Sequence, residues 1–270
     1  MVVFQALTWE ARDGEDEHLI SIFGKTEDGK SVCLTTAFTP YFFIKLPGGI
    51  DSQKVQRIYN ILGDKCKDSL VAYSLMKSKD VWGFQNNEEF AYMKINFKDL
   101  QARRLVDSFL RRPLDRTPEL FELFGVRNVK VYESNLDPVL RLMHRTGIQS
   151  TGWLDSGEKC VRSHLANVDI DLFCNDWTTL KPVARDDIAP FVVASVDIEC
   201  NSSTGKFPDA NIPGDACFQI AISLCKFGSD EPYDKTCLCY KQTDPTLEGC
   251  DIRSYATERE MLEAFQKYLH

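Results

Sequence analysis

A largely apolar segment, without polar alternation and followed by two acidic residues, lies in the last third of the chain. Residues 191–196 read Phe-Val-Val-Ala-Ser-Val, and Asp197, Ile198 and Glu199 follow directly. A run without polar alternation is typical of a central strand covered on both faces, as in an α/β sheet. The segment therefore predicts a layered sheet in this part of the chain, with both carboxylates at the end of a buried strand.

Asp197 and Glu199 are two residues apart, so a strand presents both side chains on one face. Adjacent carboxylates repel each other unless water or a cation lies between them. Oxygen ligands of this kind suit Mg²⁺ or Mn²⁺, and a pair of such ions can activate a water that attacks a phosphodiester. The residues alone leave two interpretations open: a metal site or a solvated strand end. The similar patterns Glu15–Glu17 and Asp169–Asp171 are expected to face water.

Further strands and a capped helix follow this segment. We expect strands over 217–225 and 236–240, and a helix after Thr257, because Thr257 and Glu260 have the spacing of a capping box. The chain stops directly after this helix, at His270. Capping alone does not decide between a natural C-terminal helix and a chain that is cut within a longer sequence.

The first part of the chain changes from strand-rich to helix-rich segments. Residues 1–46 are rich in strand-forming residues, and apolar residues at helical spacing follow at about 55–62, 97–112 and 136–146. The stretch 181–190 contains two prolines and four charged residues, which is typical of a linker. A domain boundary is therefore expected near its end.

The second of these helices carries Arg103, Arg104, Arg111 and Arg112. A solvated helix face is the ordinary role of such residues. The alternative is a patch that contacts phosphates, because the guanidinium fork matches phosphate oxygens. The net charge of −8 argues against non-specific binding of nucleic acid through overall charge, but not against a local basic patch.

Composition excludes several classes of protein. The chain is 43% apolar, which allows a packed core and excludes a wholly disordered chain. No apolar run is long enough to span a bilayer, and the N-terminus lacks the layout of a signal peptide. Eight of the ten cysteines lie between Cys160 and Cys250 without a C-x-x-C pair, so we expect thiols in a reducing compartment, the cytoplasm or nucleus. A structural zinc site at Cys237 and Cys239 is the less common alternative.

Three blocks of sequence stand in a specific order. The first is Phe-Thr-Pro-Tyr-Phe-Phe at 38–43, and the second is Val-Tyr-Glu-Ser-Asn-Leu-Asp-Pro-Val-Leu-Arg at 131–141, with Gly152 and Trp153 further on. The third comprises Ala-Pro-Phe at 189–191, Ser-Val-Asp-Ile-Glu-Cys at 195–200, Gly-Lys-Phe-Pro at 205–208 and Gly-Asp-Ala-Cys-Phe-Gln-Ile at 214–220. The first two resemble the N-terminal domain of family B DNA polymerases, and the third resembles their first exonuclease motif. The combination is most similar to the delta-type branch, in particular to replicases of large DNA viruses.

The resemblance implies a mixed α+β fold with two parts. Residues 1–189 would be the β-rich N-terminal domain, OB-like or mixed α+β. Residues 190–270 would begin an RNase H-like α/β domain with 3′→5′ exonuclease activity, and would lack its second and third motifs. The palm with the polymerase aspartates is not present in the sequence. The resemblance thus favours an N-terminal fragment of a proofreading DNA-directed DNA polymerase, a nucleotidyltransferase that is also a hydrolase.

The resemblance also implies roles for particular residues. Asp197 and Glu199 would be catalytic ligands of Mg²⁺ or Mn²⁺ in a two-metal site that is incomplete in this chain, and Phe207 would help to position the primer terminus. With half of the ligands missing, we expect the chain alone to be inactive. The implied partners are primer–template DNA, a single-stranded 3′ end and the rest of the polymerase, with a sliding clamp as an open candidate and no membrane. The resemblance to viral replicases also implies that the protein is located at a viral replication site in the host nucleus or cytoplasm.

A competing interpretation is a self-contained, non-enzymatic module that binds nucleic acid or docks onto replication subunits, or one chain of a split polymerase. An OB-like N-terminal part would suit single-stranded nucleic acid. Tyr41, Phe42 and Phe43 are then candidates for base stacking, although packing in the core is the more common role of such residues.

Overall fold

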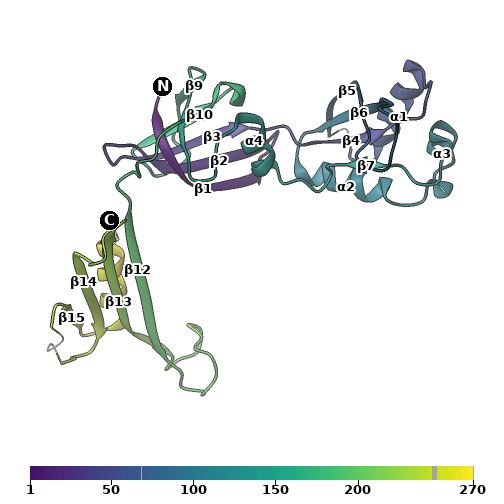
Figure 1. The fold of residues 1–270 in the computed structure, drawn as a ribbon. Coiled ribbons are helices and arrows are strands. Elements are labelled where there is room, and N and C mark those ends of the chain that lie inside the picture. Colours follow the sequence, from purple (N-terminus) through teal and green to yellow (C-terminus); the bar gives the residue numbers. More distant parts are fainter. Residues whose placement is uncertain (68, 245–247, 270) are drawn as a thin grey trace. The chain divides into compact units, whose positions relative to one another are not determined.

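The computed structural model describes residues 1–67, 69–244 and 248–269. It divides into two compact units, Met1–Ala189 and Pro190–His270 (Figure 1). The first unit contains two sheets and the second contains one. The mixed α+β class predicted from the sequence is confirmed, and so is the strand-rich beginning of the chain.

A seven-stranded sheet forms one part of the first unit, in the order β11-β8-β1-β2-β3-β10-β9. Neighbouring strands are antiparallel except β3 and β10, which are parallel. Its apolar core includes Phe4, Ile22, Leu34 and Leu154. The strands are β1 (Val3–Asp13), β2 (His18–Lys25), β3 (Ser31–Ala37), β8 (Trp153–Asp155), β9 (Cys160–Arg162), β10 (Ile170–Cys174) and β11 (Lys181–Val183), and the short 3-10 helix η2 (Trp177–Thr179) precedes β11.

A four-stranded antiparallel sheet forms the other part of the first unit, in the order β5-β6-β4-β7. Two helices cross between its strands, and their side chains cover one face of the sheet. Asp51 and Asp99 cap these helices by accepting hydrogen bonds from the first-turn amides of Lys54 and Ala102. The elements are β4 (Tyr41–Lys45), α1 (Ser52–Lys65), β5 (Leu70–Ser78), β6 (Phe90–Phe97), α2 (Leu100–Leu110), η1 (Leu114–Arg116), α3 (Pro118–Phe124) and β7 (Val131–Tyr132).

Helix α4 (Pro138–Thr146) connects the two parts of the first unit. The Asp137 side chain caps its start, and Gly147, with φ of +74°, ends it in the left-handed conformation that glycine accepts best. The buried Leu142 packs with Ile20 and Phe38. The helix predicted at 136–146 is therefore confirmed, with its start two residues later.

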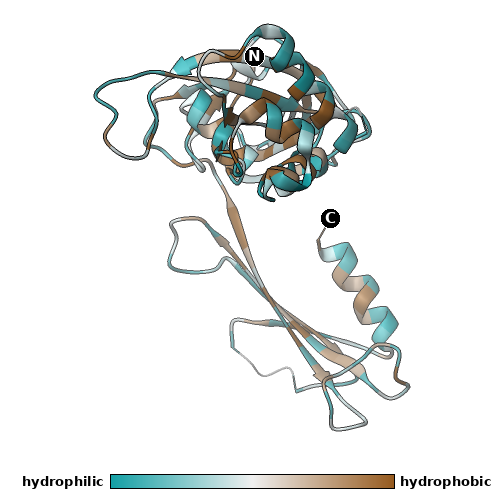
Figure 2. Ribbon diagram, turned by 90° about the vertical axis from the view of Figure 1, so that its right-hand side faces the viewer, coloured by the Kyte–Doolittle hydropathy of each residue, from teal (hydrophilic) through white to brown (hydrophobic). Residues whose placement is uncertain are grey.

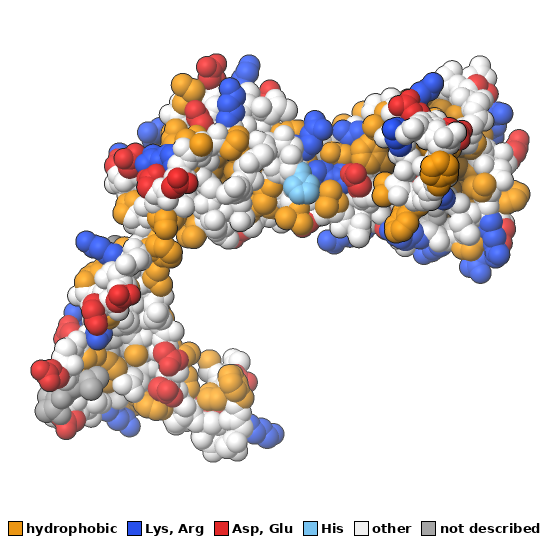
Figure 3. Space-filling model, viewed as in Figure 1, with side chains coloured by type: hydrophobic (Ala, Val, Ile, Leu, Met, Phe, Trp, Pro, Cys, Tyr) orange, Lys and Arg blue, Asp and Glu red, His pale blue; other side chains and the backbone are white. Residues whose placement is uncertain are grey.

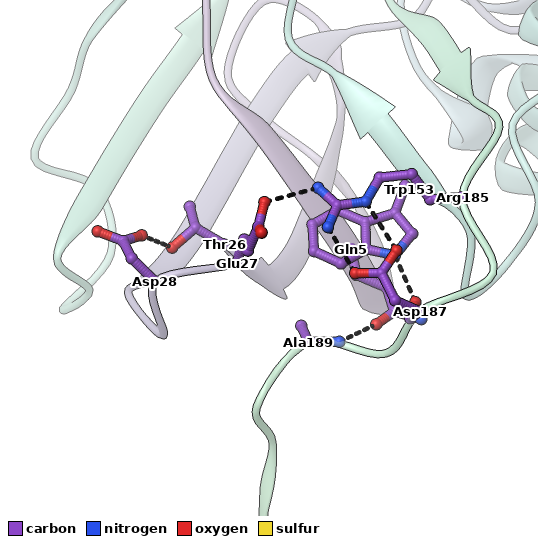
Figure 4. Close-up of polar contacts among 8 residues, drawn as sticks. All are labelled: Gln5, Thr26, Glu27, Asp28, Trp153, Arg185, Asp187 and Ala189. Carbon is purple, nitrogen blue, oxygen red and sulfur yellow. Dashed lines mark hydrogen bonds and ion pairs between the residues drawn. The ribbon is translucent and has the colours of Figure 1, made fainter.

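The stretch predicted as a linker is held against the first unit for most of its length. β11 pairs with β8, and the Arg185 guanidinium then stacks on the Trp153 ring at 4.0 Å (Figure 4). Arg185 also pairs with Glu27 at 2.9 Å and with Asp187. The Ala189 amide donates to Gln5 Oε1 at 2.7 Å. The first unit thus holds its last residue in place, directly before the second unit begins.

The second unit is a four-stranded sheet in the order β12-β13-β14-β15, with one helix on one face (Figure 2). Ile220, Ile222 and Leu238 of the sheet pack against Met261 of the helix. The capping box predicted at Thr257 and Glu260 is present at the start of this helix. The elements are β12 (Val192–Asn201), β13 (Ala216–Lys226), β14 (Asp234–Tyr240), β15 (Asp251–Tyr255) and α5 (Glu258–Tyr268).

The prediction that the apolar segment 191–196 forms a central, covered strand is wrong for this structure. β12 lies at the edge of the sheet, and Val196 and Ile198 are 44% and 57% exposed. Helix α5 contacts β13, β14 and β15, and hydrophobic side chains remain on the surface over β12 (Figure 3). The described residues therefore leave part of the apolar surface of β12 exposed.

Candidate metal centre

Asp197 and Glu199 lie on one face of β12, as their spacing predicts. Asp197 is opposite Ala221 of β13, and Glu199 is opposite Gln219. The intervening Ile198 is opposite Ile220, which packs against α5. Because side chains alternate along a strand, both carboxylates point away from the helix, onto the face of the sheet that α5 leaves open.

Both carboxylates are exposed, and neither forms an ion pair within the described part of the chain. Asp197 Oδ1 accepts a hydrogen bond from the Ile198 amide at 3.0 Å. Asp197 also lines a shallow depression that includes Ser195, Ser223 and Lys235. The carboxylate oxygens are thus accessible to a ligand from solvent.

The pair has the oxygen donors that Mg²⁺ and Mn²⁺ prefer. Among the described residues, however, no group of three or more His, Cys, Asp or Glu side chains could hold a metal ion together. Mg²⁺ takes about six oxygen ligands and often keeps several waters. Asp197 and Glu199 therefore fit a divalent cation as part of a ligand set, with further ligands needed from elsewhere.

A β-bulge directly follows Glu199, because the register between β12 and β13 shifts between Glu199 and Cys200. The amide of Cys217, at this bulge, donates to the side chain of Glu258 at 2.8 Å. Glu258 is the first residue of α5, so this contact ties the helix to the irregular end of the strand pair. Sequence reasoning recognised the capping box but gave no role to Glu258.

The loop between β12 and β13 is organised by a single carboxylate. Asp215 accepts hydrogen bonds from the amide and hydroxyl of Ser203, both at 2.6 Å, and from the amide of Asp209. These donors hold the pKa of Asp215 below its usual value. Asp215 belongs to the sequence block 214–220, but its role in the loop depends on contacts that cannot be predicted from spacing alone.

Residues 129–270, slightly more than half of the chain, match the family described as DNA polymerase family B, exonuclease domain. The chain belongs to the family B DNA polymerases. It is 31% identical over 98% of its length to a DNA polymerase of Acanthamoeba polyphaga mimivirus, and 29% identical over 99% to one of Paramecium bursaria Chlorella virus NY2A. It is 26% identical over 93% to the DNA polymerase delta catalytic subunit of Schizosaccharomyces pombe. The resemblance to viral and delta-type polymerases that the sequence predicts is confirmed.

This family B polymerase chain spans 16% to 28% of the length of these three relatives. The family B DNA polymerase from the hyperthermophilic archaeon Pyrobaculum calidifontis superimposes on 99% of the chain with a TM-score of 0.61 and 15% identity, over 29% of its own length. At this identity the superposition supports the fold. No helix within the described ranges has the length and apolar character needed to cross a membrane.

The four arginines predicted as a phosphate-contacting patch do not form one exposed surface in this polymerase chain. Arg103 is buried and donates to the Leu136 carbonyl at 2.7 Å. Arg111 pairs with Asp107 at 2.9 Å, and Arg104 and Arg112 are exposed. Arg103 thus supports the packing of α2, and contact with nucleic acid stays a prediction for the exposed arginines.

Phe207 is 93% exposed in the loop that Asp215 organises. It lines a depression together with Ile198 and Leu262, on the side of β12 that faces α5. The carboxylates of this family B polymerase segment point to the other side, so the structure does not bring Phe207 and Asp197 into one depression. The role of Phe207 at a primer terminus stays a prediction.

Proposed function

We propose that this chain forms the N-terminal part of a replicative DNA-directed DNA polymerase and begins its 3′→5′ proofreading exonuclease. In this proposal residues 1–189 are the N-terminal domain, OB-like in part, and residues 190–270 open the exonuclease domain. The match to a family B exonuclease domain over 129–270 supports it, together with relatives that are named DNA polymerase and DNA polymerase delta catalytic subunit. The observation that carries the proposal is the same-face pair Asp197 and Glu199 within the matched segment.

Asp197 and Glu199 would hold a divalent cation, Mg²⁺ or Mn²⁺, through their carboxylate oxygens. When bound, such an ion supplies an activated water and offsets the charge that develops on a phosphodiester. The strand fixes the two carboxylates on one face, and the absence of α5 from that face leaves room for a single-stranded 3′ end. Lys235, in the same depression as Asp197, offers a positive charge for the substrate phosphate.

We further propose that residues 1–270 alone are inactive as a nuclease. Two carboxylates rarely hold a catalytic Mg²⁺ without further ligands, and the described residues group no third acidic or imidazole side chain with them. The other ligands would come from polypeptide outside these residues. The proposed partners are primer–template DNA, the rest of the polymerase and a sliding clamp, at a replication site in the nucleus or cytoplasm.

A nuclease assay tests the site and the inactivity separately. The chain 1–270 should not shorten a 5′-labelled single-stranded oligonucleotide with Mg²⁺ or Mn²⁺. A longer chain, extended by the downstream coding sequence, should remove 3′ nucleotides. Asp197→Ala or Glu199→Ala should slow that reaction by more than about 100-fold, since even indirect support of a metal ligand is worth 10- to 100-fold. Asp186→Ala, an exposed acid outside the sheet, is the matched control.

Each outcome has a distinct meaning. Metal-dependent degradation by 1–270 that Asp197→Ala abolishes would overturn the inactivity and leave the site in place. Full activity of the extended chain with Asp197→Ala would remove Asp197 from the metal site. A stop codon directly after His270 would instead favour the self-contained module or the split polymerase.

A further inference from the structure

The hairpin of β9 and β10 forms one edge of the seven-stranded sheet (Figure 1). Cys160 begins β9, Cys174 ends β10, and the register places the two residues directly opposite each other. Directly opposite side chains of antiparallel strands lie on the same face of the sheet. Both residues are free thiols and pack against the apolar core of the sheet. The fold therefore brings together two thiols that thirteen residues separate in the sequence.

The backbone hydrogen bonds of the hairpin define which kind of pair the two cysteines form. Antiparallel strands alternate between pairs that exchange two backbone hydrogen bonds and pairs that exchange none. The Ser163 amide donates to the Asp171 carbonyl at 2.9 Å. The Asn175 amide donates to the Lys159 carbonyl at 3.1 Å. These bonded pairs lie three positions and one position along the ladder from the cysteines, so the cysteines form a pair without backbone hydrogen bonds.

A disulfide fits this position in the ladder. Opposite residues without backbone hydrogen bonds between them have Cα atoms about 4.5 Å apart, and their side chains are the closer ones of the ladder. Disulfides join residues whose Cα atoms are roughly 4.4–6.8 Å apart and whose Cβ atoms are roughly 3.5–4.5 Å apart. Cys160 and Cys174 can thus be linked without a change of register.

Other contacts hold the hairpin in register while the cysteines are reduced. Asp171, which the sequence led us to expect at the surface, is 8% exposed, and its carboxylate accepts hydrogen bonds from the amides of Leu165 and Ala166. The loop is also tied to β3, because the amide and hydroxyl of Ser31 donate to Asp169 at 2.8 and 2.7 Å. The two thiols are therefore already in place before any bond between them forms.

The two thiols differ in their access to solvent. Cys174 is fully buried, whereas Cys160 in the edge strand is partly exposed. The Cys160 thiol donates to the Ser156 carbonyl at 2.9 Å, and the Cys174 thiol donates to the Asp176 carbonyl at 3.3 Å. Thiols are weak donors, so the loss of these two hydrogen bonds on oxidation costs little. A small oxidant can therefore reach Cys160 first, and Cys174 can react through Cys160.

The contact between the thiols also changes their acidity. A hydrogen bond with Cys160 lowers the pKa of Cys174 to about 6, although burial acts in the opposite direction. The same hydrogen bond, together with burial, raises the pKa of Cys160. The pair thus holds one thiol and one thiolate near neutral pH. The thiolate is the form that attacks a disulfide, so the acidity of the pair supports what its geometry allows.

We propose that Cys160 and Cys174 form a reversible dithiol–disulfide switch that a low-molecular-weight disulfide, such as oxidised glutathione, closes and so fastens β9 to β10. Cys160 passes its proton to Cys174 and attacks one sulfur of the oxidant, which forms a mixed disulfide and releases one thiolate. This thiolate takes up the proton of Cys174. The Cys174 thiolate then attacks the Cys160 sulfur, which closes the protein disulfide and releases the second thiol. The two cysteines lose two electrons and two protons, and the oxidant becomes two thiols.

The switch goes beyond the proposed polymerase function and does not depend on it. Neither Asp197 nor Glu199 takes part, and no metal is needed. In the reducing compartment expected from the sequence the pair stays open, because disulfides there are mostly transient or redox-sensing. Oxidising conditions would close it and restrain an edge strand that, within the described ranges, pairs with β10 alone.

Two other thiol pairs compete for the same oxidant. Cys200 lies opposite Cys217, but the β-bulge after Glu199 makes that position irregular. The sulfur atoms of Cys237 and Cys239 lie 3.6 Å apart, but both belong to β14. Residues two apart in a strand have Cα atoms about 6.8 Å apart, at the upper limit for a disulfide. The position of Cys160 and Cys174 is the most regular of the three.

The chain 1–270 is equilibrated with mixtures of oxidised and reduced glutathione and is then examined by intact mass and peptide mapping. A closed disulfide removes two hydrogens, whereas a mixed disulfide adds one glutathione. We expect a closed disulfide between Cys160 and Cys174 that dithiothreitol reverses, and its loss in Cys160→Ser. Cys225→Ser is the matched control, because Cys225 is also partly exposed and its thiol also donates to a carbonyl, but Val193 lies opposite it. This variant should form the disulfide as the unaltered chain does.

A second measurement tests whether closure fastens the hairpin. All four tryptophans lie in the first unit, so their fluorescence follows its melting. Closure should raise the Tm by roughly 5–10 °C, because a cross-link over about 15 residues restricts the unfolded chain. Cys160→Ser should melt as the reduced unaltered chain does, which also shows that the variant folds, and glutathione should not change its Tm.

Four results would overturn the proposal, and the first three need only the unaltered chain. One is a chain whose mass does not change in oxidised glutathione. Another is a glutathione adduct on Cys160 that persists without closure. The third is a disulfide that maps to Cys200 and Cys217, to Cys237 and Cys239, or to two different chains. The fourth is a closed disulfide between Cys160 and Cys174 that leaves the Tm unchanged, because β9 would then not be fastened.

Discussion

Asp80 shows how one side chain can hold the irregular loop after β5. Its carboxylate is almost fully covered, although its neighbours in sequence, Lys79 and Val81, are exposed. It accepts hydrogen bonds from Lys45 and Tyr132. The hydrogen bond from Lys45 is the main cause of a pKa far below the usual value, against the opposing effect of burial. The group therefore stays charged, and its two donors hold the start of the loop after β5 against β4 and β7.

We predict that Asp80→Asn destabilises the chain by about 2 kcal/mol at pH 7, because a covered ammonium group loses its counter-charge. The depressed pKa of the folded state stabilises the protein above pH 3.8, the unperturbed value. This contribution is lost as the pH falls from there toward the folded pKa. Urea unfolding at pH 7, 5 and 3 should show a gap between the two proteins that is constant at the higher two values and smaller at pH 3.

Asp28→Asn is the matched control, because Asp28 pairs with Lys30 at 2.7 Å but both side chains are more than half exposed. An ion pair that is exposed on both sides contributes little to stability, because water screens it. Equal losses for Asp80→Asn and Asp28→Asn would show that the coverage of Asp80 does not matter.

The sequence predicted correctly that Asp197 and Glu199 share a face, since that depends only on the period of a strand. It did not predict that Arg103 is buried. Its guanidinium reaches the carbonyl of Leu136, which is 33 residues away, and such a contact depends on packing between distant elements. Charge alone therefore overestimated the exposed basic surface of α2.

At the scale of single elements, α5 depends on the contacts of its N-cap and first turn. Thr257 accepts from the Glu260 amide, and the Glu260 side chain accepts in return from the Thr257 amide. Glu258 adds the bond to the bulged Cys217 amide. The helix is thus fixed to the sheet at the end nearest the carboxylate pair.

We predict that Glu258→Ala destabilises the second unit by about 1–2 kcal/mol, because the net value of a hydrogen bond is about 1 kcal/mol and is higher when the acceptor is charged. Arg259→Ala, at the next residue, removes only an exposed pair with Glu263 and should cost less stability than Glu258→Ala. Hydrogen exchange of the Cys217 amide is the direct measurement. Faster exchange in Arg259→Ala than in Glu258→Ala would contradict the assignment.

The capping box made α5 predictable from the sequence, because its residues are local. The position of β12 was not predictable in the same way. Its apolar run is compatible with a covered strand, but cover comes from elements distant in sequence, and the described residues place α5 over the other strands. Local patterns thus predicted which elements form, and the coverage of each element required the structure.

At the scale of the whole molecule, the two units meet at a short connection. Residues up to Ala189 are tied to the first unit, and Phe191 already pairs with the second through its carbonyl, which accepts from Phe227. The linker predicted over 181–190 is therefore largely ordered. The stacking of Arg185 on Trp153 could not be predicted from the proline-rich, charged sequence of this stretch.

We predict that Arg185→Ala exposes this connection without unfolding either unit. Loss of the stacking and of the pairs with Glu27 and Asp187 should free residues 184–189, and brief thermolysin treatment should cut near Ile188 several times faster. The products should be two stable fragments. Arg116→Ala, an exposed arginine of the first unit, should leave the cleavage pattern unchanged.

The whole-chain architecture was predictable only in part. The strand-rich start and the boundary region follow from local composition, but the sheet β5-β6-β4-β7 joins β4 to β7 across almost ninety residues. The periodicity of apolar residues predicts individual strands, but not which strands pair over such a distance in the sequence. The sequence for this reason indicated Tyr41, Phe42 and Phe43 as an aromatic cluster. It did not indicate that Phe42 is buried in the core while Tyr41 and Phe43 lie on the other face of the sheet.

The exposed edge of β12 has a consequence for how the protein behaves in solution. Among the described residues, no strand pairs with the outer edge of Val192–Asn201, and neither proline nor lysine interrupts these ten residues. Asp197 and Glu199 are the only charged residues of that strand, and we expect their negative charge to oppose the addition of a second copy to the sheet. A cation that neutralised the two carboxylates would weaken this opposition, so we expect metal binding and self-association of the chain to be coupled.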